Sequence, residues 1–365
     1  MPGIGLLGVT FGYLVAMDSP AGRDPGSFHW GTTLWHEMAH VFTLEATNHL
    51  VPRWYSEGIS MYEEWQADPS WGERLSPDLI KAVQEDKLLP VAELDKGFMR
   101  PRYPSQVVVS YFQAGLVCQM IADTWGFSKL VDLLRGFGEG KSTPDNFQAV
   151  LGISAEEFDK QFDAYIDKLT GPVVKGFATW RKKLSEAIEA TAAEKWPETV
   201  EAAREARDLY PDYVETGNPY VLLATALDKT DDRAGAVDAL MAYRDRGGRD
   251  PGQLKKLAGW LDETGRPQEA IKTLEALLYV TPNDPELHSQ LGDWYLAAGS
   301  MDRAAREYQA ILAANPLDVA GAHFNLARTY YKMNDRARTR RHLLAALEAA
   351  PSYRPAQRLL LEITQ

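Results

Sequence analysis

Two histidines with a glutamate between them form the part of this sequence that is best suited to chemistry. His36 and His40 lie four residues apart, and Glu37 directly follows the first, in the pattern His-Glu-x-x-His. Residues four apart on an α-helix lie one above the other, so both imidazoles can reach one metal ion. Glu37 would point to the side where water bound to that ion lies, and its carboxylate could take a proton as the water attacks a carbonyl. The pattern therefore predicts a zinc site with a base beside it.

A catalytic zinc site needs a third protein ligand and one open position. The extended motif that supplies a third histidine is absent, because Thr43 and Ala46 stand where that motif has glycine and histidine. A second segment, residues 51–64, follows instead. Pro52 indicates the start of another helix, and Glu57 lies about one turn inside it. A helix antiparallel to the first could offer this carboxylate to the metal.

The two segments together resemble those of the gluzincins, in particular the bacterial peptidase MA-like proteins related to the glycyl and alanyl aminopeptidases. In that family a Trp-x-x-Glu-Gly-x-x-x-Tyr segment follows the His-Glu-x-x-His helix, and the matching residues here are Trp54, Glu57, Gly58 and Tyr62. The resemblance covers roughly the first 170 residues. It implies that Zn2+ is bound by His36, His40 and Glu57. Glu37 would then be the general base that activates a zinc-bound water for peptide-bond hydrolysis.

The segment before the first histidine alternates in side-chain type and predicts one strand, from Leu6 to Met17. By the resemblance, such a strand borders the cleft and can pair with an extended substrate. Gluzincins carry several more strands ahead of this one. We therefore expect either a reduced sheet or, as we favour, a fragment of a longer bacterial protein. Asp18 could help to hold a substrate's amino terminus or could simply cap a loop.

A helix predicted from about Gln106 to Trp125 carries the candidate oxyanion donor. Related aminopeptidases place a tyrosine three residues before a glycine on this helix, but here Phe112 occupies that position and Tyr111 precedes it. Tyr111 is the predicted donor to the oxyanion. Tyr103 is a second candidate for that role, and Tyr111 could instead be a half-buried aromatic residue without a catalytic part.

Charge and composition exclude several classes of function. A net charge of −12 argues against a nucleic-acid partner, because binding phosphates requires a basic face. The single cysteine, Cys118, cannot form an internal disulfide and lies in an apolar helical run, which predicts a buried thiol. Residues 1–17 are apolar, but they lack a basic leading region and are too short to span a bilayer. We expect a soluble chain with neither signal peptide nor membrane span, and the sequence does not indicate a compartment.

From about Phe177 the sequence becomes rich in alanine, and a helical pattern recurs about every 34 residues. The recurring positions are Leu257, Leu261, Gly265, Ala270 and Pro282, then Leu291, Tyr295, Gly299, Ala304 and Pro316, and more loosely Leu326, Tyr330, Asn334, Ala346 and Pro351. They predict tetratricopeptide-like helix pairs, with two degenerate pairs ahead of them and a final helix from Tyr353 to Gln365. Such arrays present a concave face to peptides or proteins, although this one could be scaffold alone.

The predicted fold is mainly α. A gluzincin-like α+β metallopeptidase domain with a truncated N-terminal sheet is expected at residues 1–172. Degenerate helical repeats or linker helices occupy 173–250, and tetratricopeptide repeats with a terminal helix occupy 251–365.

The predicted function is zinc-dependent hydrolysis of a peptide or protein, whether by an aminopeptidase or an endopeptidase, with the repeats recruiting substrate or a protein partner. The alternative is a catalytically inactive binding scaffold built on a degenerate peptidase domain. Glu37 favours the enzyme, because a decayed enzyme has no chemical need for that base. The displaced tyrosine and the short sheet favour the scaffold.

Overall fold

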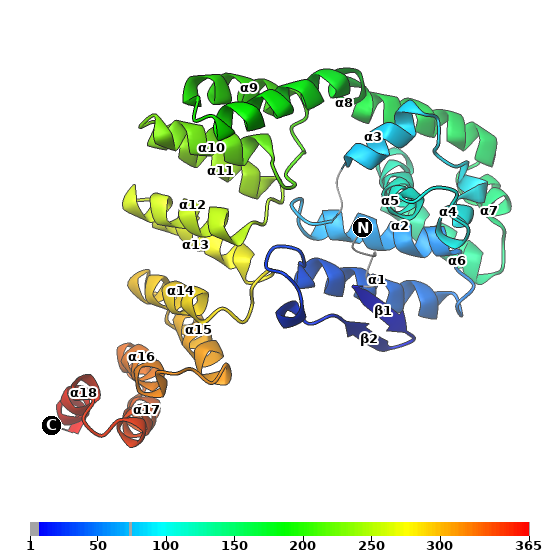
Figure 1. Ribbon diagram of the computed structural model, residues 1–365. Helices are drawn as coiled ribbons and strands as arrows, with labels where there is room; N and C mark the ends of the chain where they lie inside the picture. Colours follow the sequence, from blue (N-terminus) through cyan, green and yellow to red (C-terminus); the bar gives the residue numbers. More distant parts are fainter. Residues whose placement is uncertain (1–6, 73–74, 365) are drawn as a thin grey trace. The chain divides into compact units, whose positions relative to one another are not determined.

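The computed structural model describes residues 7–72 and 75–364, and almost all of its regular structure is helical (Figure 1). The mainly α fold predicted from the sequence is thereby confirmed. Contacts group the chain into two units. Among the described residues, the first holds those of 7–18 and 30–248, and the second holds those of 19–29 and 249–364. The three domains expected from the sequence, 1–172, 173–250 and 251–365, stay a prediction.

The chain begins with a β-hairpin rather than the single strand that the alternation predicts. Strand β1 (Gly8–Phe11) pairs antiparallel with β2 (Leu14–Met17), with Thr10 opposite Val15. Gly12, in the turn between them, has φ of 57°, which a residue without a side chain adopts at little cost. The alternation continues through the turn, so it does not reveal the reversal. Leu6, the predicted first residue of the strand, lies outside the described residues.

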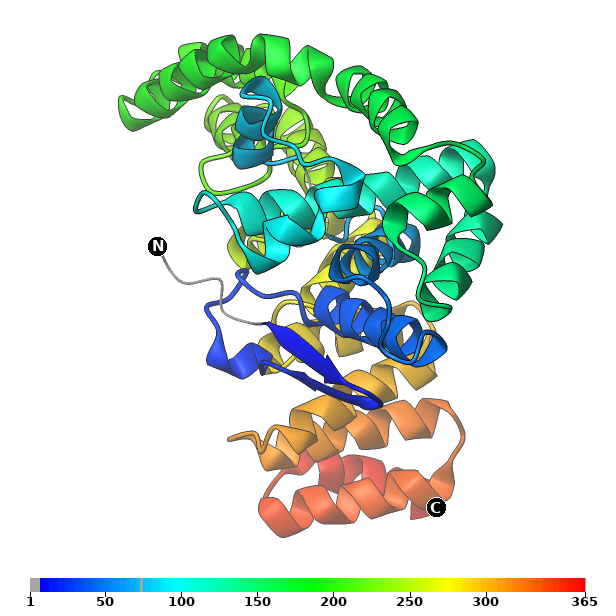
Figure 2. The same ribbon diagram turned by 90° about the vertical axis from the view of Figure 1, so that its right-hand side faces the viewer.

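The hairpin lies beside the first helix of the unit, as Figures 1 and 2 both show. That helix, α1 (Trp30–Ala46), packs against α2 (Arg53–Ala67), which begins directly after Pro52 as predicted. Helix α2 packs in turn on α5 (Gln106–Trp125), the helix expected at these bounds. Gly58 permits the close approach of α2 to α5, because a Cβ there would lie 2.6 Å from the carbonyl oxygen of Ala114.

The other short elements of the first unit surround these helices. They are α3 (Pro77–Gln84), the 3-10 turn η2 (Val91–Glu93), α4 (Asp95–Met99), α6 (Phe127–Gly138) and α7 (Thr143–Val150). The core between them is rich in aromatic side chains, including Trp54, Tyr55, Phe147 and Phe158. Cys118 is buried in this core, and burial raises the pKa of its thiol, as the sequence led us to expect of a structural cysteine.

Helix α5 has the length and apolar composition of a membrane-spanning helix, and among the described residues no other helix does. However, 61% of its most apolar window is buried inside the protein, where it contacts α2, α4, α6 and α8. These contacts are those of a core helix.

Helix α8 (Ala155–Ala192) begins with Ser154, whose hydroxyl accepts from the amide of Glu157, as in the capping pattern of its sequence. It continues through Pro172 and joins the segment that carries the predicted ligands directly to the first helix pairs. Three further helices complete the first unit: α9 (Trp196–Leu209), α10 (Pro219–Lys229) and α11 (Arg233–Asp245).

The second unit consists of helix pairs at the positions where the sequence repeats. In each pair two consecutive helices pack together, and the second helix contacts the first helix of the next pair. Asp284 and Asp318 each cap the first helix of a pair by accepting backbone hydrogen bonds. The helices are α12 (Pro251–Glu263), α13 (Pro267–Leu277), α14 (Pro285–Ala297), α15 (Met301–Ala313), α16 (Val319–Lys332), α17 (Arg336–Ala349) and the final α18 (Arg354–Thr364). The unit also includes the turn η1 (Pro20–Gly22).

Candidate metal centre and active site

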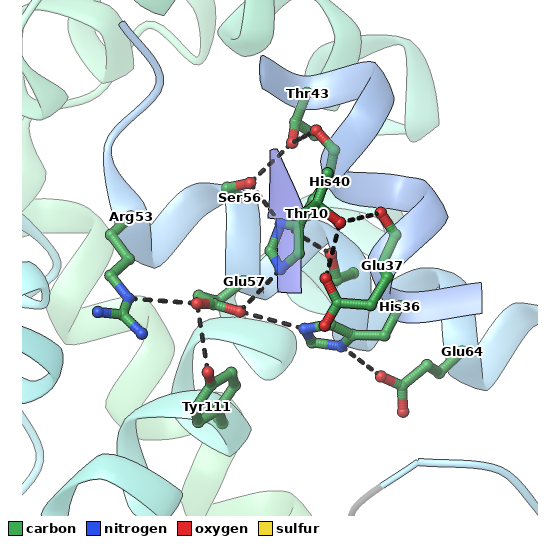
Figure 3. A network of polar contacts seen from close by, with 11 residues as sticks. Thr10, His36, Glu37, His40, Thr43, Arg53, Ser56, Glu57, Glu64 and Tyr111 are labelled. Atoms are coloured by element: carbon green, nitrogen blue, oxygen red, sulfur yellow. Dashed lines mark hydrogen bonds and ion pairs between the residues drawn. The ribbon is translucent and has the colours of Figure 1, made fainter. Parts of the chain in front are cut away.

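Helices α1 and α2 bring the three predicted ligands together (Figure 3). The Nε2 atoms of His36 and His40 each lie 3.1 Å from the same carboxylate oxygen, Oε2 of Glu57. One ligand atom from each residue lies within 4.8 Å of the others. The two imidazole rings stand nearly perpendicular, at an interplanar angle of 81°, so their nitrogens converge from different directions. Two imidazole nitrogens and a carboxylate oxygen are a donor set that suits zinc.

Each histidine is oriented by a second contact on its far nitrogen. Nδ1 of His36 lies 2.5 Å from Oε1 of Glu64, and Nδ1 of His40 lies 2.8 Å from the hydroxyl of Ser56. The Ser56 hydroxyl also lies 2.7 Å from that of Thr43. Such contacts fix the ring and its tautomer, and they leave Nε2 directed at the shared point between the ligands.

The charges around the histidines favour a cation at this point. Burial lowers the pKa of His36, but its hydrogen bonds to Glu57 and Glu64 outweigh that effect and raise the pKa to about 10. Burial raises the pKa of Glu57, but its hydrogen bonds to His36 and His40 outweigh that effect and hold the pKa well below its usual range. A proton on His36 thus places one positive charge beside the carboxylates of Glu57 and Glu64. The residues fit a divalent cation, which would replace that positive charge.

Glu37 is held against the hairpin. The hydroxyl of Thr10 on β1 lies 2.7 Å from Oε2 of Glu37 and 2.9 Å from its backbone oxygen. A Cβ at Gly8 would lie 2.6 Å from Cγ of Glu37, so the strand fits tightly over this side chain. Glu37 itself is 6% exposed. The strand that was expected to border the cleft therefore contacts the predicted base directly.

Tyr111 lies at the same site, on the side of Glu57 away from the histidine contacts. Its hydroxyl donates to Oε1 of Glu57 at 3.2 Å, and Nε of Arg53 donates to the same oxygen at 3.2 Å. Burial and the charge of Glu57 raise the pKa of Tyr111, which keeps the phenol protonated as a donor. The structure thus places Tyr111 close to the predicted ligands.

The other aromatic candidates on and before α5 lie elsewhere. Phe112, at the family's tyrosine position, is buried and packs on Trp65 with ring centroids 5.7 Å apart. Tyr103 lies beneath the ammonium group of Lys87. The buried Tyr103 hydroxyl has no hydrogen-bond partner in the described part of the chain, and no described contact joins it to the histidines.

Four residues of the site were not identified from the sequence: Thr10, Arg53, Ser56 and Glu64. Glu64 lies seven residues after Glu57, two helical turns along the same face of α2, and this spacing is a signal that could have found it. No comparable signal exists for Thr10, because its contact with Glu37 depends on how the hairpin packs on α1.

Comparisons with known proteins support the first unit's assignment at the level of a superfamily. A family model of the Peptidase MA superfamily matches residues 13–168, which include both histidines, Glu37, Glu57 and Tyr111. No curated protein matches the chain.

Among solved structures, similar ones include YrrB, described as a TPR protein with an unusual peptide-binding site. It is 18% identical, with 48% of this chain and 89% of YrrB covered and a TM-score of 0.36. A MamA protein is 16% identical, covering 47% of this chain and 91% of its own, at a TM-score of 0.34. MamA from Desulfovibrio magneticus RS-1 is also 16% identical, covering 48% of this chain and 96% of its own, at a TM-score of 0.32.

Proposed function

We propose that this chain is a zinc-dependent peptidase of the gluzincin type. The observation that carries the proposal is the convergence of His36, His40 and Glu57 within 4.8 Å, next to a buried carboxylate at Glu37. Zinc held by these three ligands would supply Lewis acidity, which polarises a substrate carbonyl and makes a water molecule more acidic.

The chain's own residues supply the other parts of the reaction. Glu37 would accept the proton of the attacking water and later pass it to the leaving amine, as a general base and then a general acid. Thr10 would hold one oxygen of Glu37 so that the other stays available. Tyr111, protonated and close to Glu57, would donate to the oxygen of the substrate carbonyl as negative charge develops there.

We also propose that the helix pairs recruit a peptide or protein, either the substrate itself or a partner. Stacked helix pairs of this kind offer an extended surface on which a protein segment can lie. This part of the proposal is independent of the metal centre and can fail without it.

A quenched peptide library tests the enzymatic proposal. We expect the zinc-loaded protein to cleave members of the library and Glu37→Gln to lower the rate by at least about 100-fold, because general-base catalysis typically contributes 10²–10⁴-fold. Zinc content should stay unchanged in this variant. Glu63→Gln is the matched control, since Glu63 lines an apolar cavity with Trp35 and Phe127 rather than the metal centre. Full activity in Glu37→Gln would refute the assigned base, and zinc binding without cleavage by the wild type would favour the scaffold alternative.

A further inference from the structure

We propose that Arg53 forms a subsite for a carboxylate of the substrate, next to the scissile bond. The carboxylate can be the substrate's C-terminal group or the side chain of an aspartate or glutamate. This inference rests on the proposed peptidase function and specifies the class of substrate: peptides with a negative charge close to the bond that is cleaved.

The guanidinium of Arg53 is held in place by three contacts. Its Nε donates to Oε1 of Glu57, while both histidines contact the other oxygen of that carboxylate. The guanidinium also lies over the ring of the buried Phe98, at 5.6 Å from its centroid, and Nη1 lies 3.9 Å from the sulfur of Met99. Arg53 is therefore positioned on the metal centre before any substrate arrives.

The Nε edge of the guanidinium faces Glu57, and the two Nη atoms lie farther from it (Figure 3). The Arg53 side chain is 47% exposed. Within residues 7–72 and 75–364, no carboxylate other than Glu57 forms an ion pair with it. Asp95 lies near Arg53 without forming an ion pair with it, and its carboxylate accepts a hydrogen bond from the amide of Trp54. The outer edge of Arg53 can thus accept a further anion.

This arrangement suits a carboxylate, the anionic group that a peptide carries. A guanidinium presents paired N–H donors in a planar fork that matches the two oxygens of a carboxylate. The fork is partly desolvated by Phe98, which strengthens such a contact relative to bulk water. Arg100, which directly follows Met99, is exposed. A substrate carbonyl at the metal would place the neighbouring residues of the peptide within reach of Arg53.

The competing explanation is that Arg53 only holds Glu57 in position. The two explanations differ in what they predict for different peptides. A residue that merely positions Glu57 affects all peptides equally. A carboxylate subsite instead makes the loss specific to peptides that carry the negative charge.

Fluorescence anisotropy of labelled peptides on zinc-loaded Glu37→Gln protein tests the subsite without turnover. Three versions of one cleavable peptide are compared: a neutral amidated form, the same form with a free C-terminal acid, and an amidated form with aspartate beside the scissile bond. We expect at least one charged form to bind about tenfold more tightly than the neutral form, since hydrogen bonds to charged groups contribute at least this much. The form that shows this preference identifies the source of the carboxylate.

Adding Arg53→Gln should remove this preference, so that the charged and neutral forms bind equally when the peptides are compared at a zinc concentration that keeps the site loaded, because Arg53 also contacts Glu57. Arg100→Gln, a change at an exposed arginine, is the matched control and should retain most of the preference. Arg53→Lys, which keeps the charge and loses the fork, should give an intermediate preference if Arg53→Gln fails to fold.

Equal binding of all three peptides, or an equal loss for all three in Arg53→Gln, would overturn the subsite. Failure of the proposed peptidase function has a different signature. In that case the wild type would cleave none of the peptides, while the charge preference in binding would remain.

Discussion

Two pairs of histidines in this protein have similar ring separations but oppositely charged surroundings. In the first unit the rings of His36 and His40 lie 4.8 Å apart, centroid to centroid, on one helix. In the second unit His323 on α16 and His342 on α17 lie 5.3 Å apart, and their Nδ1 atoms face each other at 3.0 Å. Geometry alone would make both pairs candidates for a metal ion.

The two pairs differ in the charges that surround them. Carboxylates of Glu57 and Glu64 adjoin the first pair, and they raise the pKa of His36 to about 10 against the effect of burial. Around the second pair, burial, His323 and the positive charges of Arg341 and Arg338 lower the pKa of His342 to about 4. A cation that replaced a proton would be stabilised at the first pair and repelled at the second. The comparison indicates that the carboxylates, more than the histidine spacing, would favour a metal ion at the first pair.

Removing a carboxylate from the first pair should have the largest effect. Glu64→Gln keeps the size of the side chain and removes the charge beside Nδ1 of His36. We expect zinc affinity to fall by roughly 10–100-fold, the usual range for a lost outer contact to a metal ligand. Titration against a chromophoric chelator measures this, with Glu63→Gln as the control. An unchanged affinity would mean that Glu64 plays no part in preparing His36.

The two pairs also differ in the residue that follows the first histidine, which is Glu37 after His36 and Phe324 after His323. Removing the contact that holds Glu37 should have a smaller effect than removing Glu64. Thr10→Val removes the hydroxyl that contacts Glu37 and keeps the β-branched shape. We expect kcat to fall roughly tenfold with zinc content and KM little changed, since one hydrogen bond to a charged group is lost. Thr10→Ser should recover most of the rate. If the valine variant kept the wild-type kcat, the hairpin would not position the base.

The second histidine pair should make the stability of the folded protein depend on pH. The pKa of His342 is lowered in the folded protein, so between about pH 6.5 and pH 4 the unfolded chain binds the extra proton. Stability should therefore fall as pH drops through this range, by about 1 kcal/mol after allowance for solvent screening. Denaturant unfolding of the wild type and His342→Gln at pH 7.5 and pH 5 measures the difference, and the variant should lose less stability on acidification.

His288, in the same unit, should give a pH dependence of stability opposite in sign to that of His342. Its hydrogen bond to Glu307 raises its pKa, so its contribution to stability is fully present below about pH 6.5 and is lost as the pH rises through the folded value. His288→Gln should therefore cost more stability at pH 5 than at pH 7.5. An identical pH dependence of stability in His288→Gln and His342→Gln would contradict the opposite pKa shifts of the two histidines.

Much of the candidate metal centre could be predicted because its geometry is local. The spacing of His36 and His40 fixes a shared helical face, and the Trp-x-x-Glu-Gly segment locates Glu57 on the next helix. The repeat period likewise predicted helix pairs, because each pair depends on contacts between neighbours in the sequence.

The features that the sequence did not reveal depend on how strands and helices pack against one another. The alternation from Val9 to Ala16 does not distinguish one strand from a hairpin, since the turn at Gly12 preserves it. The contact of Thr10 with Glu37 follows from the packing of the hairpin on α1, which no single segment encodes. The ion pair of Arg53 with Glu57, by contrast, joins residues four apart on one helix, a spacing that could have predicted it. Arg338 and Arg341 lie four and one residues before His342 on one helix, so their charges can be read from the sequence, but the contact of His323 with His342 joins two helices and could not be.

Elemental analysis of purified protein tests the central claim most directly. The wild type, Glu57→Ala and His323→Ala are each equilibrated with zinc, freed of loosely bound metal by gel filtration, and assayed for zinc per chain. We predict about one zinc per chain in the wild type and in His323→Ala, and little or none in Glu57→Ala. Zinc retained in full by Glu57→Ala, or lost on changing His323, would contradict the assignment of the metal to the pair surrounded by carboxylates.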